Sequence, residues 1–196
     1  MEIKLDTGFK FITVDNHQAI SDEIYNFVVS QTDLLQREDQ FLLTPVDIPF
    51  MLEHTPLLKD FLEKKTLKPR MMAIVVVHAE CSGKEIHIDY IDTPTPTFIR
   101  LLWPVKHCTG SVTKLYNIPQ ECLEEVSQPN GIVYYNITDY QRRKYLCEFE
   151  LRAPVVFDVS KAHEVHTAPG IIEHRISFTI GFEFGSDVSK SFDAWS

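Results

Sequence analysis

Residues 69–90 read PRMMAIVVVHAECSGKEIHIDY, and they begin a succession of short β-rich runs that continues to Phe184. Each run is rich in Val, Ile, Phe or Tyr and is bounded by Pro, Gly, Asn or Asp, which favour turns. Because no long helix separates the runs, they predict a mainly β domain, either a double-sheet sandwich or a jelly roll. The predicted strands are Met71–His78, Ile86–Tyr90, Thr97–Trp103, Ser111–Tyr116, Gly131–Ile137, Tyr145–Leu151, Val155–Val159 and Arg175–Phe184.

The residues before this series predict an opening β segment, Ile3–Val14, followed by helices that support the sheet. Apolar residues recur at helical spacing from Ile20 to Val28 and again from Phe50 to Leu62, where Pro56 predicts two short helices or a kinked one. In the later part of the chain only Pro119–Val126 has a helical pattern. We therefore expect a single domain over residues 1–196, with an N-terminal strand and helices at 1–68, a jelly-roll core at 69–184 and a tail at 185–196.

The composition is that of an ordinary globular domain, and its charge excludes some classes of partner. The chain has 196 residues, with 19 Lys plus Arg against 28 Asp plus Glu, a net charge of −9. An acidic protein repels phosphate backbones and anionic lipid surfaces, so we expect neither nucleic acid nor membrane as a partner. Without a signal-peptide core or a long apolar run, we expect a cytoplasmic protein. The four cysteines form no Cys-x-x-Cys pair and predict reduced thiols.

His87 and Asp89 lie two residues apart in the predicted strand Ile86–Tyr90. Residues i and i+2 of a strand point to the same side, so both side chains converge on one point. An imidazole and a carboxylate can bind a divalent transition metal, and a second imidazole would complete the facial triad that holds iron(II) and leaves positions open. That histidine must come from further along the chain, where His163 and His166 are the two candidates.

A polar face is predicted on the segment His174–Phe182. Ile176 and the alternate residues after it share one face, whereas Arg175, Ser177 and Thr179 share the other. If both faces are buried, the guanidinium of Arg175 needs an anionic partner, because an unpaired buried charge is costly. A small-molecule carboxylate held by Arg175 and Ser177 would supply that partner. The alternative is an exposed polar face on an edge strand.

In this order, His-x-Asp, a distal His and Arg-x-Ser resemble the motifs of the iron(II)- and 2-oxoglutarate-dependent oxygenases, over residues 69–184. The stretch FDVSKAHEV, residues 157–165, looks most like the branch that contains the aspartyl/asparaginyl β-hydroxylases and the small prolyl hydroxylases. In that branch the histidine before Glu-Val or a similar pair binds the metal, so the resemblance implies His163 rather than His166. The β-hydroxylases tend to lack the carboxylate that Asp89 supplies, so their substrate is not carried over.

The resemblance implies a double-stranded β-helix, the cupin-like jelly roll, with His87, Asp89 and His163 as iron ligands. It also implies that Arg175 and Ser177 hold 2-oxoglutarate, and that Arg100 faces this co-substrate unless it makes a surface salt bridge. The implied reaction uses O2 to hydroxylate a C–H bond of an amino acid or peptide side chain, releasing succinate and CO2.

Two other functions use the same residues differently. A cupin-like binding protein would keep the fold with an inert metal site. A zinc hydrolase would use the two histidines and the carboxylate with a metal-bound water, and it would have no role for Arg175 and Ser177. The sequence does not specify the oligomeric state or the primary substrate, which we expect to be a small molecule or a peptide.

Overall fold

The computed structural model describes residues 8–31, 41–77, 86–89, 98–127, 133–167, 174–183 and 186–195, and of residues 41–43, 127, 133 and 134 the backbone alone. The helices are α1 (His17–Ser30), α2 (Ile48–His54), α3 (Pro56–Lys64) and α4 (Asp187–Lys190), with 3-10 turns η2 (Gln120–Cys122), η3 (Tyr140–Arg142) and η4 (Phe192–Trp195). The strands are β1 (Phe9–Phe11), β2 (Phe41–Pro45), β3 (Pro69–Val77), β4 (His87–Asp89), β5 (Ile99–Lys106), β6 (Val112–Asn117), β7 (Leu123–Ser127), β8 (Val133–Ile137), β9 (Lys144–Glu150), β10 (Val155–Asp158), β11 (Ala162–His166) and β12 (Arg175–Phe182).

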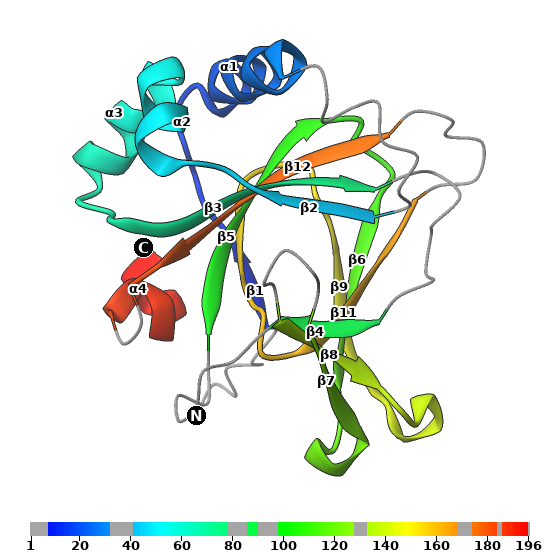
Figure 1. The fold of residues 1–196 in the computed structure, drawn as a ribbon. Coiled ribbons are helices and arrows are strands. Elements are labelled where there is room, and N and C mark those ends of the chain that lie inside the picture. Colours follow the sequence, from blue (N-terminus) through cyan, green and yellow to red (C-terminus); the bar gives the residue numbers. More distant parts are fainter. Residues whose placement is uncertain are drawn as a thin grey trace.

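The strands form two six-stranded antiparallel sheets (Figure 1). The first has the order β1-β10-β5-β12-β3-β2, and the second has the order β7-β8-β4-β11-β6-β9. From β3 to β6, and again from β10 to β12, successive strands alternate between the two sheets. This alternation is the path of a double-stranded β-helix, so the predicted jelly-roll fold is confirmed.

Helices cover the outer face of the first sheet (Figure 1). Phe178 and Ile180 of β12 are fully buried there, in one core cluster with Ile24 of α1 and Leu58 of α3. Each large apolar side chain buried in this way contributes about 1.5–3 kcal/mol relative to an exposed one. The break predicted at Pro56 separates two helices, since Pro56 begins α3 immediately after α2 has ended at His54.

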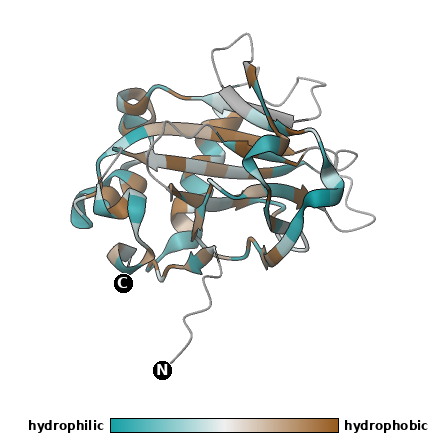
Figure 2. Ribbon diagram, turned by 90° about the horizontal axis from the view of Figure 1, so that it is seen from below, coloured by the Kyte–Doolittle hydropathy of each residue, from teal (hydrophilic) through white to brown (hydrophobic). Residues whose placement is uncertain are grey.

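The inner face of the first sheet looks toward the second sheet and carries the polar residues of β12. β12 is a central strand between β5 and β3, and all eight of its residues are buried. The alternative prediction, that Arg175, Ser177 and Thr179 form an exposed face on an edge strand, is therefore wrong. In Figure 2, hydrophobic and hydrophilic residues alternate along several strands, as expected where the two faces meet different surroundings.

Two local predictions differ from the structure. The helix predicted at Pro119–Val126 is wrong, because the 3-10 turn η2 is followed at once by β7, which pairs with β8 in antiparallel register. Apolar residues at Cys122, Leu123 and Val126 fit a helix as well as a strand, and the available partner strand selects the extended form. The strands β2 and β11 were not predicted.

The remaining boundaries agree within a few residues where they can be compared. Parts of the predicted strands at residues 3–7, 78, 90, 97, 131–132 and 184 lie outside the described residues. Among the described residues, no helix has both the length and the apolar character needed to cross a bilayer.

Candidate metal centre and its cavity

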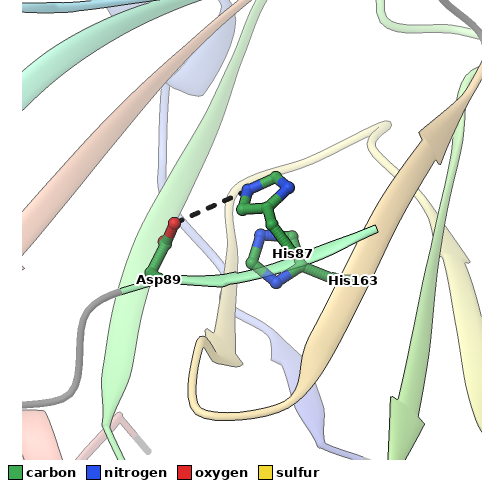
Figure 3. Close-up of side chains that lie close together, drawn as sticks. All are labelled: His87, Asp89 and His163. Carbon is green, nitrogen blue, oxygen red and sulfur yellow. Dashed lines mark ion pairs between the residues drawn. The ribbon is translucent and has the colours of Figure 1, made fainter. Parts of the chain in front are cut away.

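His87 and Asp89 point into the space between the sheets from β4. They alternate with Ile86 and Ile88, which are buried on the outer face of the second sheet in a cluster with Tyr116. This apolar packing on one face fixes the strand so that its two polar side chains face inward. His87 Nε2 lies 3.6 Å from Asp89 Oδ1, so the two predicted ligands converge (Figure 3).

His163 reaches the same point from β11, the neighbouring strand. His163 is directly opposite His87 in the antiparallel register, and the ring centroids of the two histidines are 4.4 Å apart. One ligand atom each of His87, Asp89 and His163 lies within 4.8 Å of the other two. Two imidazoles and a carboxylate at this spacing fit a facial triad for a divalent transition metal such as iron(II).

His166 lies on the other face of β11. Residues three apart on a strand point to opposite faces, so His163 and His166 cannot both face the cavity. His163 and Val165 line the cavity, whereas His166 Nε2 lies 2.9 Å from Glu164 Oε1 on the outer face. Tyr116 donates a hydrogen bond to the same carboxylate, with 2.5 Å between the oxygens. The structure thus groups His163, and not His166, with His87 and Asp89.

The environment of His163 fits the requirements of a metal ligand. Its Nδ1 lies 3.0 Å from the carbonyl oxygen of Lys161. Because a carbonyl can only accept, Nδ1 carries the proton and Nε2 presents its lone pair to the cavity. Burial, reinforced by the neighbouring His87, lowers the pKa of His163 to about 4, so the ring is neutral at physiological pH.

This low pKa predicts a loss of stability in acid for the metal-free protein. The unfolded chain takes up the His163 proton near the ordinary pKa of 6.5, whereas the folded protein does so only near pH 4. Between these values the unfolded state binds more protons, so the free energy of unfolding should fall by about 3 kcal/mol as the pH drops from 6.5 to 4. Urea unfolding of the metal-free protein at several pH values measures this.

The matched variants for this experiment are His163→Asn and His166→Asn. Asparagine cannot titrate but can still donate to the Lys161 carbonyl, so His163→Asn should flatten the pH profile in that window. The same change at His166, on the outer face of the strand, should leave the fall in the free energy of unfolding that comes from His163 unchanged. A profile that is unchanged by His163→Asn would contradict the assignment.

Asp89 is held in its ionised form by Arg100. Burial alone would raise the pKa of Asp89, but the Arg100 guanidinium, with smaller contributions from His163 and His87, brings it below its usual value. Arg100 Nη1 donates to Asp89 Oδ2 across the interior at 2.5 Å, and both side chains are largely buried. Arg100 therefore enters the cavity from β5 and makes an interior ion pair, not the surface salt bridge that was the alternative.

Arg175 and Ser177 line the same cavity from the first sheet. Arg175 is 1% exposed and Ser177 is fully buried. Arg175 Nη1 donates to Ser177 Oγ at 3.3 Å, but within the described part of the chain the buried Nε and Nη2 of Arg175 have no hydrogen-bond partner. Burial lowers the pKa of Arg175, yet a guanidinium stays charged. A buried cation with two unused donors fits a ligand carboxylate.

The cavity joins these groups into one site. It has a volume of about 50 Å³ and is lined by all six predicted site residues, His87, Asp89, Arg100, His163, Arg175 and Ser177. Its remaining wall is Val75, Leu102, Thr113, Phe157, Val165 and Thr179.

Thr113 is a wall residue that the sequence analysis did not single out. Its Oγ1 is buried and has no hydrogen-bond partner among the described residues. Its position two residues before Leu115 on a half-buried strand could have indicated that it faces inward.

Comparisons with known proteins bear on the fold. No protein-family model and no curated protein matches the chain. Among solved structures, the epimerase SnoN in complex with Fe3+, alpha-ketoglutarate and nogalamycin RO matches with a TM-score of 0.50 at 10% identity, over 88% of this chain and 77% of that one.

Two further structures match at lower scores. A prolyl-4-hydroxylase from Pseudomonas putida has a TM-score of 0.46 at 12% identity, covering 90% of this chain and 92% of that one. HygX from Streptomyces hygroscopicus, with nickel and 2-oxoglutarate bound, has a TM-score of 0.44 at 11% identity, covering 100% and 94%. At such identities the likeness concerns the fold alone, which this chain shares with SnoN.

Proposed function

We propose that this chain is an iron(II)- and 2-oxoglutarate-dependent oxygenase that hydroxylates a C–H bond of a small molecule or a peptide side chain, with release of succinate and CO2. The observation that carries the proposal is the pairing of two sites in one cavity. The cluster of His87, Asp89 and His163 lines one part of the cavity. The buried guanidinium of Arg175, with two N–H donors that have no partner among the described residues, lines another part.

In this proposal each residue of the metal end has a stated task. His87 and His163 would bind the iron as neutral imidazoles, and the Lys161 carbonyl would keep the lone pair of His163 Nε2 available. Asp89 would supply the negative ligand through Oδ1, since Oδ2 already accepts from Arg100. Three protein ligands on one face leave positions open for other molecules.

The other end of the cavity would hold the co-substrate. The Nε and Nη2 edge of Arg175 forms a planar fork that matches the two oxygens of a carboxylate, and Ser177 keeps the guanidinium oriented through Nη1. Iron(II), 2-oxoglutarate and O2 together supply the oxidising power for hydroxylation when bound. The apolar wall residues Val75, Leu102 and Phe157 would limit access of water to the reacting groups.

The two rival functions fit these residues less well. A zinc hydrolase would use the metal ligands but has no role for a buried guanidinium with unused donors. An inert binding protein has no need of it either, and an unpaired buried charge destabilises a fold that does not use it. Arg175 therefore favours the oxygenase over both.

Succinate formation tests the proposal without knowledge of the substrate. We expect the protein, given iron(II), 2-oxoglutarate and air, to convert 2-oxoglutarate slowly to succinate even without a substrate, and NMR quantifies both acids. The His163→Ala variant is the control and should give only the background level. Succinate no higher with the wild-type protein than with that variant would contradict the proposal.

A further inference from the structure

Arg100 and Arg175 share two features at the cavity, although Arg175 has a further unpartnered donor, Nη2, that Arg100 does not. Each uses Nη1 to donate to a neighbouring side chain, Asp89 Oδ2 for Arg100 and Ser177 Oγ for Arg175. Each also has a buried Nε with no hydrogen-bond partner among the residues that the structure describes. A buried N–H donor without an acceptor is costly, so the Nε of Arg100, like that of Arg175, calls for a ligand acceptor.

The two guanidinium groups originate at different ends of the cavity. A Cβ placed on Gly181 would lie 3.8 Å from Arg100 Nε, so Arg100 extends over the end of β12 near Gly181. Arg175 is at the opposite end of the same strand, six residues away, or about 20 Å along an extended chain. A co-substrate held between Arg175 and the metal ligands leaves the Nε of Arg100 for another molecule.

The net charge of the cavity also supports a further anionic ligand. Asp89 contributes one negative charge, and Arg100 and Arg175 contribute one positive charge each. A divalent metal and a dicarboxylate would cancel each other, so the complete site would keep one net positive charge in a largely buried space. One further anionic group would neutralise it, and a carboxylate oxygen could accept from the Nε of Arg100.

We propose that Arg100 is a second carboxylate-binding group of this cavity and that the primary substrate is therefore a carboxylic acid of net negative charge. This inference rests on the proposed function and narrows its substrate class. It also gives Arg100 a different ligand from the co-substrate that the sequence resemblance suggested.

Binding to the anaerobic protein with iron(II) and 2-oxoglutarate tests the inference. Short-chain hydroxy and aliphatic acids are titrated alongside their primary amides, while the visible band of the iron–2-oxoglutarate complex is followed. We expect at least one acid to change the band saturably and its amide to bind at least about tenfold more weakly, the loss of one charge-assisted contact.

Two variants separate this role from the ion pair with Asp89. Arg100→Lys keeps a cation beside Asp89 but lacks the Nε donor, so it should form the band with 2-oxoglutarate and lose the preference for acid over amide. Gly181→Ala places a methyl group beside Nε without removing any charge, and it should also weaken the acid. Ile180→Val, on the helix-covered face of β12, is the control and should bind the acid normally.

The outcomes distinguish the two proposals. If the band forms but no acid changes it, or if amides bind as well as acids, the substrate class proposed here is wrong and the oxygenase assignment stands. An acid preference that survives Arg100→Lys would likewise overturn the role of Arg100. Failure of the band to form with 2-oxoglutarate alone would overturn the proposed function, and this inference with it.

Discussion

Replacement of His163 by alanine is expected to raise the dissociation constant for iron(II) by at least about 100-fold, whereas His166→Ala should change it by less than about threefold. The loss should exceed the 10–100-fold that removal of a partner behind a metal ligand costs, because a ligand itself is lost. His163 faces Asp89 and His87, while His166 faces Glu164 on the other side of the same strand. Anaerobic calorimetric titration with iron(II) measures both constants.

The two histidines make a matched pair for this test. They lie on the same strand, and the same substitution is made at each, so a general effect on β11 would reach both variants. Circular dichroism and urea unfolding would show that both variants fold. Iron(II) binding that is lost in His166→Ala and kept in His163→Ala would contradict the assignment.

Replacement of Arg175 by methionine is expected to have opposite effects on binding and on stability. Loss of two charge-assisted hydrogen bonds should weaken 2-oxoglutarate binding by at least about 100-fold while sparing the metal. The ligand-free protein should gain about 1–3 kcal/mol in free energy of unfolding, because methionine fills a similar volume without an unpaired buried charge. Titration with 2-oxoglutarate in the presence of iron(II), and urea unfolding in its absence, measure the two effects.

Arg70→Met is the control for this experiment, since Arg70 is an exposed arginine on β3. It should leave both the affinity for 2-oxoglutarate and the stability close to those of the wild-type protein. A structural role for Arg175 predicts the reverse of our expectation. Arg175→Met would then destabilise the ligand-free protein, and the affinity for 2-oxoglutarate would be unchanged in the fraction that folds.

The separation of β12 into an apolar and a polar face could be predicted from sequence, but the burial of the polar face could not. Alternation from Arg175 to Phe182 separates a wholly apolar face from a polar one, and an apolar face of that length must be covered. Once both faces are buried, an inward arginine requires an anion. The same period-two reasoning predicted that His87 and Asp89 converge.

The choice between His163 and His166 could not be made from composition or periodicity. The strand β11 is short and reads AHEVH, with too few apolar residues to be recognised as a strand. From the sequence alone, only the resemblance to the oxygenases favours His163. Once the strand is known, its alternation makes the same choice on physical grounds, since residues three apart point to opposite faces.

The contact between Arg100 and Asp89 could not be predicted either. Asp89 lies on β4 of the second sheet and Arg100 on β5 of the first, so their contact crosses the interior. A sequence pattern gives the face on which a residue lies but not which residue opposes it on another sheet. For the same reason, the sequence could not show that the buried Thr113 hydroxyl has no hydrogen-bond partner among the described residues.

Anaerobic titration of the iron(II)-loaded protein with 2-oxoglutarate is the most direct test of the claim that one cavity holds both the metal and the co-substrate. The account predicts a weak visible charge-transfer band that saturates at one equivalent of 2-oxoglutarate per iron and is absent in His163→Ala. A protein that binds iron(II) but develops no such band at saturating 2-oxoglutarate would contradict it.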